Sequence, residues 1–452
     1  MNKKIFLALV MGLSSCATYH AQPLPAQPTV LRSYSEIVVD RNRISLPNLS
    51  AHEIDARNGL DMDAVAILAV LNNPDLKIAR DDAHVAQAQA FAAGLLPDPQ
   101  IAVTHDFDQN PPPGATTPFS IGLSEDISAL IQHYFATRSG RYDSRKTDLN
   151  LLWQEWQVVS QARTLYVRIV KETQQMSVLQ QNRELLANRN RNMQIALDQG
   201  LLARDTITPY LVALQDLERQ IRDLERQLNT DRHGLNAFLG LSPEADVPLR
   251  ETVDIPAVDD KEIITGLSDL ASRRPDLLAL QSGYAAQDQR YRAAIAGQFP
   301  NLTVGVTRAR DNASVYSNGF GLTLNLPIFN RNRGNIAIEQ TTRQKLYDDY
   351  QNRLNTADSD VHRILAEQRI NMQQLQDVEG AISDLSGIAA KADQALQAHE
   401  IDASTYVALQ ASYLSKQLEK IGIEQSILLQ RVTLQALVGG ELPVKHNQKS
   451  ES

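Results

Sequence analysis

Residues with chemical reactivity are sparse in this chain, and their spacing builds no catalytic or metal site. The nine histidines are scattered, and none forms a His-x-x-x-His pair or a cluster with cysteine. The sequence contains no glycine-rich phosphate loop and no Gly-x-Ser-x-Gly elbow. We therefore predict no catalytic residue, no bound metal and no cofactor. A formal net charge of −9 and the lack of a basic stripe argue against nucleic-acid binding.

The only cysteine, Cys16, ends a predicted targeting segment. Two lysines precede an apolar run at 5–11, and Leu13-Ser14-Ser15-Cys16 is similar to a bacterial lipobox. The alternative is an ordinary signal peptide that contains a chance cysteine. We predict that residues 1–15 are removed and that Cys16 is lipidated. By similarity to bacterial lipoproteins, Ala17 after the cysteine favours the outer membrane.

The sequence repeats itself at a spacing of about 200 positions, which is too long for a solenoid repeat. Each copy reads as a long helical stretch, two short strands and a second long helical stretch. The matching segments are Asn73-Pro-Asp-Leu76 with Arg274-Pro-Asp-Leu277, Phe119-Ser-Ile-Gly-Leu123 with Phe320-Gly-Leu-Thr-Leu324, and Ala237-Phe-Leu-Gly240 with Ala436-Leu-Val-Gly439.

Four segments alternate apolar side chains with small polar ones, the period of a half-buried strand. They are predicted at about 100–107, 117–125, 301–309 and 318–326. Four strands cannot close a membrane barrel, because spanning barrels need at least ~8 and an open edge leaves backbone groups unpaired in lipid. Three copies of the chain would supply twelve.

Long helices follow each pair of strands. Residues 133–198 and 332–397 contain no proline, and helices of that length span on the order of 100 Å. In the segments that return from them, apolar residues recur at an average spacing of ~3.5, the period of a coiled coil. A helical bundle core fits the same spacing, but the helix length favours the coiled coil.

Two predicted turns, 198–205 and 397–404, reverse the chain between these helices. Asp205 and Ser404 are predicted N-caps of the returning helices. Gly200 is the expected left-handed residue that ends a helix.

These patterns divide the chain into six parts. They are a signal peptide at 1–15, a lipid-anchored extended tether at 16–60, a first repeat at 61–240, a linker at 241–266, a second repeat at 267–440 and a disordered tail at 441–452.

The repeats resemble the TolC-type outer-membrane efflux family over about residues 60–440. Arg273-Arg-Pro-Asp-Leu277, Phe299-Pro300 before a strand and Leu326-Pro-Ile-Phe329 after one carry this resemblance. Gly94-Leu-Leu-Pro-Asp-Pro99 and Phe329-Asn-Arg-Asn-Arg-Gly334 are similar to its heavy-metal-efflux, CzcC-like branch.

The resemblance implies a mainly α fold with a small β part. Long antiparallel coiled-coil helices would form an α-helical barrel, and four strands per chain would contribute to a trimeric twelve-stranded transmembrane β-barrel. The homotrimer would lie in outer-membrane lipid with a large periplasmic part. It would passively conduct cargo from a periplasmic adaptor and an inner-membrane pump, an RND-type exporter of heavy metals or drugs.

The same resemblance assigns roles to the turns. An acidic ring of Asp393 in the trimer, or Asp198, would gate the periplasmic end and attract cations; the alternative is that these are solvated helix-end charges. The candidate adaptor-docking residues are Gly200, Leu201, Asp205, Ile401, Asp402 and Ser404.

A periplasmic coiled-coil adaptor is the main alternative function, because adaptors also have helical hairpins. An adaptor would show a biotinyl-lipoyl-like β domain flanking a single hairpin, rather than a duplication of strands and helices.

Overall fold

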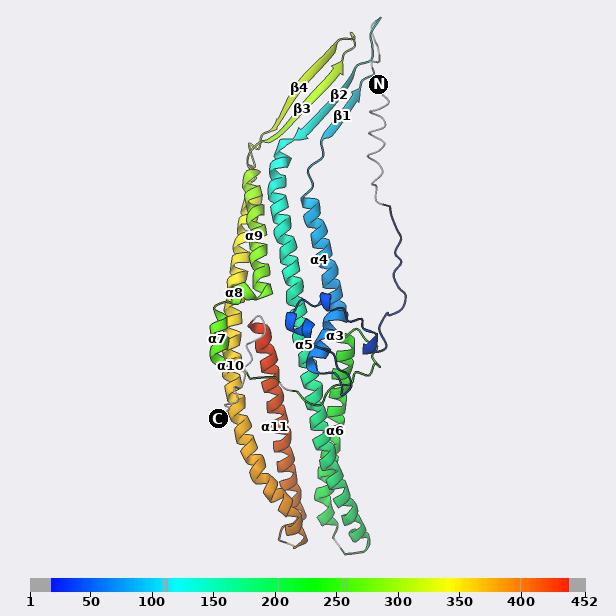
Figure 1. Ribbon diagram of the computed structural model, residues 1–452, viewed down its shortest axis with the longest axis vertical. Coiled ribbons are helices and arrows are strands. Elements are labelled where there is room, and N and C mark those ends of the chain that lie inside the picture. Colours follow the sequence, from blue (N-terminus) through cyan, green and yellow to red (C-terminus); the bar gives the residue numbers. More distant parts are fainter. Residues whose placement is uncertain are drawn as a thin grey trace.

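A computed structural model describes residues 18–107, 109, 113–201, 203–253, 255–257, 259–398 and 400–438. The molecule is elongated, with a sheet at one end and the turns of two helical hairpins at the other (Figure 1). The predicted lipidation site, Cys16, and the predicted tail at 441–452 lie outside the described residues.

The elements follow the order expected from the duplication. The first repeat contains α3 (Met62–Asn72), α4 (Pro74–Ala93), β1 (Gln100–His105), β2 (Phe119–Asp126), α5 (Ile127–Asp198) and α6 (Arg204–Phe238). The second contains α7 (Asp260–Leu267), α8 (Leu270–Arg273), α9 (Pro275–Ala296), β3 (Asn301–Arg310), β4 (Tyr316–Asn325), α10 (Arg333–Gln397) and α11 (Ala403–Leu437).

The four strands form one antiparallel sheet in the order β1-β2-β3-β4. The two repeats meet in this sheet, because β2 pairs with β3 from Phe119 opposite Arg310 to Asp126 opposite Thr303. The prediction of four strands is confirmed, and the predicted strand ends differ from the observed ones by two residues or fewer.

The two faces of the sheet differ in chemistry, as the alternation predicted. One face carries exposed apolar side chains from all four strands, among them Ile101, Leu123, Val306 and Leu322. The other carries small and polar side chains, and Thr104 lies 2.5 Å from Ser120 across it (Oγ1 to Oγ). A sheet with two such faces fits an environment that is apolar on one side and aqueous on the other.

Two helical hairpins extend away from the sheet. α5 and α10 are continuous over 72 and 65 residues, and each reverses into a partner of 35 residues, α6 and α11. The absence of proline from α5 and α10 permits this length, because proline breaks the ladder of hydrogen bonds inside a helix. Together with the small sheet, the hairpins confirm the predicted mainly α fold.

No helix among the described residues is both long enough and apolar enough to cross a membrane.

The main core lies near the middle of the molecule, where α3 packs against α5. Every residue of α3 from Ala64 to Leu71 is buried, as expected for a helix that is apolar on all sides. α3 ends before Asn73, whose side chain caps α4 by accepting the Leu76 N–H at 2.9 Å. Pro74 then occupies the first turn of α4, so the predicted break at Asn73-Pro74 is present.

The N-terminal strap, residues 31–51, differs from the extended tether that we expected. It contains two 3₁₀ turns, Tyr34–Glu36 and Arg41–Arg43, and the short helix α2 (Pro47–Ala51). Its side chains Ile37, Ile44 and Leu49 are buried in the main core.

A buried carboxylate on α5 holds the middle of the strap. Glu155 accepts the backbone N–H of Ser45 at 2.6 Å and its hydroxyl at 2.7 Å. Burial raises the pKa of Glu155, and the hydrogen bonds from Ser45 oppose that shift. The strap also forms a bridge between Leu31 and Leu241, so it is part of the folded body.

The end of α6 docks onto the junction of α3 and α4. The Asn72 side chain donates to the Leu239 carbonyl at 2.7 Å, and the Asn73 side chain donates to the Phe238 carbonyl at 2.9 Å. Gly240 follows with φ +66°, and a Cβ there would lie 2.8 Å from the Asn72 carbonyl oxygen. Only glycine fits both the left-handed backbone and this close approach.

Gly240→Ala should therefore destabilise the protein more than Gly200→Ala. Gly200 is also left-handed, at φ +72°, but a Cβ there would meet nothing within 4 Å. We expect about 1 kcal/mol for Gly200→Ala from backbone strain alone, and about 2–4 kcal/mol for Gly240→Ala, where a backbone clash adds to the strain. Thermal unfolding of both purified variants measures this difference, and equal shifts in Tm would contradict the packing described.

Candidate functional site

The end of the first hairpin, opposite the sheet, is a tight turn. Asp198 ends α5 and accepts from the Gln194 side chain at 2.9 Å, one turn earlier in the same helix. The Leu201 N–H bonds back to the Ala196 carbonyl at 2.9 Å, and Gly200 supplies the left-handed residue that this arrangement requires. Leu201 is 72% exposed.

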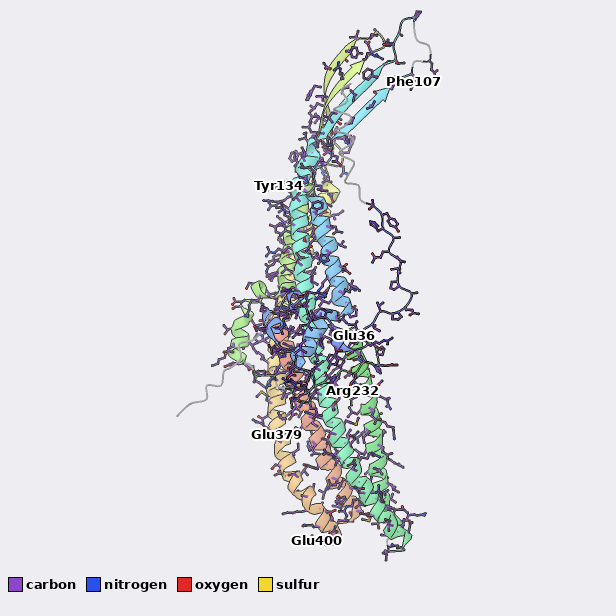
Figure 2. The ribbon with its side chains drawn as sticks, turned by 45° about the vertical axis from the view of Figure 1, so that its right-hand side comes forward. Glu36, Phe107, Tyr134, Arg232, Glu379 and Glu400 are labelled. Carbon is purple, nitrogen blue, oxygen red and sulfur yellow. The ribbon has the colours of Figure 1, made fainter. Side chains whose placement is uncertain are left out.

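The end of the second hairpin has a different cap from the one predicted (Figure 2, near Glu400). Asp402 caps α11 by accepting the Thr405 N–H at 2.7 Å, and this hydrogen bond lowers the pKa of Asp402. Ser404 lies inside the first turn of α11. Ile401, just before the cap, is partly buried against the apolar cluster, which extends from the main core along the helices to this end.

The predicted N-caps Asp205 and Ser404 are therefore both wrong. α6 begins after Ala203, which makes no side-chain capping bond, and Asp205 falls in the first turn of the helix. There its charge faces the positive end of the helix dipole. In each hairpin the returning helix begins earlier than predicted, so the predicted caps lie within the helices.

Near these turns, an ion pair joins the two hairpins. Arg189 of α5 pairs with Asp393 of α10, and Asp393 also accepts from Gln397 at 3.2 Å. The guanidinium of Arg189 lies 5.7 Å from the ring centre of Tyr406, on α11. Of the two predicted gate residues, Asp393 thus links the hairpins, whereas the hydrogen bond of Asp198 stays within α5.

Two buried tyrosines extend this link to the fourth helix. Tyr210 of α6 and Tyr406 of α11 are 0% and 1% exposed, and their ring centres lie 6.0 Å apart. Burial, and then the neighbouring Tyr406, raises the pKa of Tyr210. Arg189, Asp393, Tyr210 and Tyr406, here called the tip cluster, bring together residues from all four long helices.

Sequence reasoning identified only Asp393 of the tip cluster. One aromatic residue near the start of each returning helix was the available signal for Tyr210 and Tyr406. No local pattern marked Arg189 as a partner, because it lies far from Asp393 in the sequence.

An elongated groove of about 600 Å³ lies beside the tip cluster. α6 contributes Pro209 and Val212, α11 contributes Ala408 and Leu414, and α5 contributes Leu186. Pro209 lies inside α6 and removes one backbone donor from it. The groove is open and largely apolar, which suits it to another helix better than to a charged small molecule.

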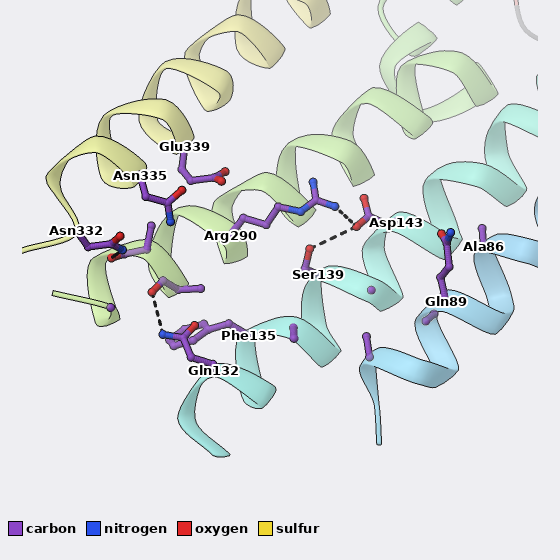
Figure 3. A pocket seen from close by; sticks show the side chains of 17 residues that line it. Ala86, Gln89, Gln132, Phe135, Ser139, Asp143, Arg290, Asn332, Asn335 and Glu339 are labelled. Atoms are coloured by element: carbon purple, nitrogen blue, oxygen red, sulfur yellow. Dashed lines mark hydrogen bonds and ion pairs between the residues drawn. The ribbon is translucent and has the colours of Figure 1, made fainter. Parts of the chain in front are cut away.

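A second cavity, of about 610 Å³, lies near the sheet between α4, α5, α9 and α10 (Figure 3). Small side chains such as Ala90 and Gly140 line one side of it. On the other, Arg290 of α9 pairs with Asp143 of α5, which also accepts from Ser139 at 3.4 Å. These contacts join the two repeats beneath the sheet and do not form a catalytic arrangement.

A pair of acids lies between α5 and α6. Glu172 and Asp231 are both buried, and Arg168 lies 3.9 Å from Asp231. Burial and then the Asp231 charge raise the pKa of Glu172 to about 8. Within the described residues, no group of three or more His, Cys, Asp or Glu side chains could hold a metal ion.

The fold is that of the outer-membrane channels known from solved structures. CusC, described as forming a transmembrane channel, superposes with a TM-score of 0.70 at 18% identity, covering 94% of this chain and 100% of CusC. VceC, an outer membrane protein of Vibrio cholerae, superposes with a TM-score of 0.72 at 13% identity, covering 84% of this chain and 97% of VceC.

The profile of the outer membrane efflux protein family matches residues 266–440 of this chain. The outer membrane protein OprJ of Pseudomonas aeruginosa is 25% identical over 390 residues, which is 80% of this chain and 79% of OprJ. The probable efflux pump outer membrane protein SepC of Pseudomonas putida is 30% identical over 162 residues. That match spans 33% of this chain and 33% of SepC. The family consists of channels rather than enzymes.

Proposed function

We propose that this chain is the exit duct of a tripartite efflux system in the outer membrane, and that it conducts cargo passively. The exposed apolar face of the sheet carries this proposal. Ile101, Val103, Phe320 and Leu322 are each more than half exposed on it. Such a surface favours contact with lipid, and the small polar face behind it favours a water-filled lumen.

The sheet edges support assembly into a trimer. Within the described residues, no strand pairs with the outer edge of β1 or of β4. In lipid such edges cannot stay unpaired, because no water is present to satisfy their backbone groups. Pairing β4 of one copy with β1 of the next satisfies both edges, and three copies then supply twelve strands.

The cargo is proposed only as a class, a heavy metal or a drug delivered by an RND-type pump. The lumen-side residues of the strands are mostly serine, threonine, glycine, asparagine and alanine, with one acid, Asp126, at the end of β2, and the small uncharged ones do not select strongly among solutes. Weak binding favours release, since a conduit must let its cargo go. Selection therefore belongs to the pump.

Arginine substitutions on neighbouring residues of β4 test which face meets lipid. Leu322 lies on the apolar face and Thr323 on the polar one. Leu322→Arg should hinder insertion into vesicles, because arginine at the bilayer midplane costs about 2–4 kcal/mol. Thr323→Arg should insert normally and lower the single-channel conductance by narrowing the lumen.

Flotation with vesicles, planar-bilayer recording and mass measurement in mild detergent give the readouts. A wild-type chain that stays monomeric and does not conduct would refute the duct. Normal insertion of Leu322→Arg with failure of Thr323→Arg would reverse the assignment of the faces.

We propose that the gate is the contact between Asp393 and Arg189. The pair connects the first hairpin to the second, so breaking it frees one hairpin to move against the other. An ion pair exposed to this degree contributes about 0.5 kcal/mol. Three such pairs in a trimer total roughly 1.5 kcal/mol, about a tenfold change in the balance of closed and open states.

Asp393→Asn and Arg189→Gln should each raise the open probability in planar bilayers by about tenfold on this basis. The double variant should add little to either single change, because both remove the same contact. Asp384→Asn is the matched control, since Asp384 is exposed on α10. Unchanged conductance and unchanged cation block in both single variants would rule out this gate.

We propose that the groove beside the tip cluster receives the helical hairpin of the periplasmic adaptor. The predicted docking residue Ser404 lines this groove, and the exposed Leu201 and the capped turn at Asp402 lie at the same end of the molecule. Val212, on the groove wall, is 55% exposed.

Ala408→Trp should reduce crosslinking from a photoreactive residue at Val212 to a periplasmic adaptor in living cells by about tenfold, because the indole fills the groove. Ala390→Trp adds the same bulk to an exposed position of α10 outside the groove and should leave crosslinking intact. Mass spectrometry identifies the crosslinked protein. Equal crosslinking in the two variants would contradict docking in the groove.

A further inference from the structure

The apolar face of the sheet ends in two arginines. Along β3, Val304 and Val306 are followed on the same face by Arg308 and Arg310, because side chains alternate along a strand. The arginines therefore point away from the small polar face that we assign to the lumen. They lie at the end of the strand farthest from the helices, the end at which Phe107 is labelled in Figure 2.

Aromatic rings flank both guanidinium groups. Arg310 is opposite Phe119 on one side and Tyr316 on the other. Its guanidinium carbon lies 5.3 Å from the ring centre of Phe119, and that of Arg308 lies 5.7 Å from the ring centre of Tyr316. We call Phe119, Arg308, Arg310 and Tyr316 the basic–aromatic rim.

The two arginines of the rim make few hydrogen bonds within the described residues. Arg308 is exposed and has no ion pair within the described residues. Arg310 donates one bond, from Nη2 to the Thr117 carbonyl at 2.9 Å. The neighbouring acid, Asp311, accepts the N–H groups of Ala313 and Val315 at 2.9 Å each. The exposed donors of this pair therefore belong mainly to Arg308, whereas Nε of Arg310 is buried without a partner among the described residues.

The position of the rim matches the outer boundary of the lipid. Eight residues separate Leu302 from Arg310, about 27 Å along a strand and roughly 20 Å of height at the usual tilt of ~40°. Arginine is tolerated at a membrane interface but strongly disfavoured at the midplane. Aromatic residues also concentrate at the interface.

We propose that the basic–aromatic rim binds the phosphate groups of an anionic lipid in the outer leaflet. The inference rests on the proposed function, since it requires the sheet to lie in a bilayer. The planar fork of an arginine matches the oxygens of a phosphate. Two arginines on one edge suit a headgroup with two phosphates, and the flanking rings hold the guanidinium groups at the height of that headgroup.

Native mass spectrometry of the full-length oligomer tests this proposal, with lipid A carrying two phosphates, monophosphoryl lipid A and phosphatidylcholine as probes. We expect the wild type to retain lipid A with two phosphates most strongly. The double variant Arg308→Gln/Arg310→Gln should retain it at least about tenfold less, since each variant side chain loses its charge. Arg219→Gln/Arg222→Gln removes the same charge from exposed sites on α6 and should behave as wild type.

Equal retention by the rim variant and the wild type would overturn the proposal, as would equal retention of phosphatidylcholine. Displacement of the lipid by millimolar inorganic phosphate would show a site for a free anion and would also overturn it. Flotation of each protein with phosphatidylcholine vesicles separates the two proposals. If the wild type does not float, the proposed function is wrong. If it floats but its lipid retention does not depend on the arginines, only the lipid site is wrong.

Discussion

The constraint on which the rest of this structure depends is the incompleteness of its sheet. Four strands present an apolar face to the surroundings and two edges whose backbone groups find no partner within the described residues. In water, such a surface would associate with other molecules. In a bilayer, the apolar face is satisfied by lipid, but the edges require further copies of the chain. The sheet thus favours both a membrane and an oligomer.

The arrangement of the helices follows from the same joining of two repeats. Because each repeat contributes two strands and one long hairpin, joining the repeats through β2 and β3 sets the two hairpins side by side. Arg290 of α9 pairs with Asp143 and joins the two repeats near the sheet, and Arg189 with Asp393 joins the two hairpins at the far end. The first contact lines a cavity among small residues. The second lies beside the turns of the hairpins, is no more exposed than the first, and is the contact that we propose as the gate.

Local patterns in the sequence predicted the elements well, because each pattern has a local cause. Leu322 and Thr323 lie on opposite faces of the sheet with different surroundings, so alternation located the strands. Pro74 located the break between α3 and α4, because its ring ends one helix and fits the first turn of the next. The strap was mistaken for a tether because the burial of Ile44 depends on partners far away, such as α5 with Glu155. The pairing of Arg189 with Asp393 was missed for the same reason, since a contact between distant residues leaves no periodic trace.

The pairing of β2 with β3 also determines when the sheet can form during folding. β2 ends at Asp126, and its second partner β3 begins only at Asn301, so β1 and β2 can pair with each other long before the four-stranded sheet can form. During that interval β2 offers an unpaired apolar edge, which is prone to aggregation. α5 and α6 are adjacent in the chain and can pair at once, whereas pairing across so many residues is slow. The complete sheet is therefore a late product of folding.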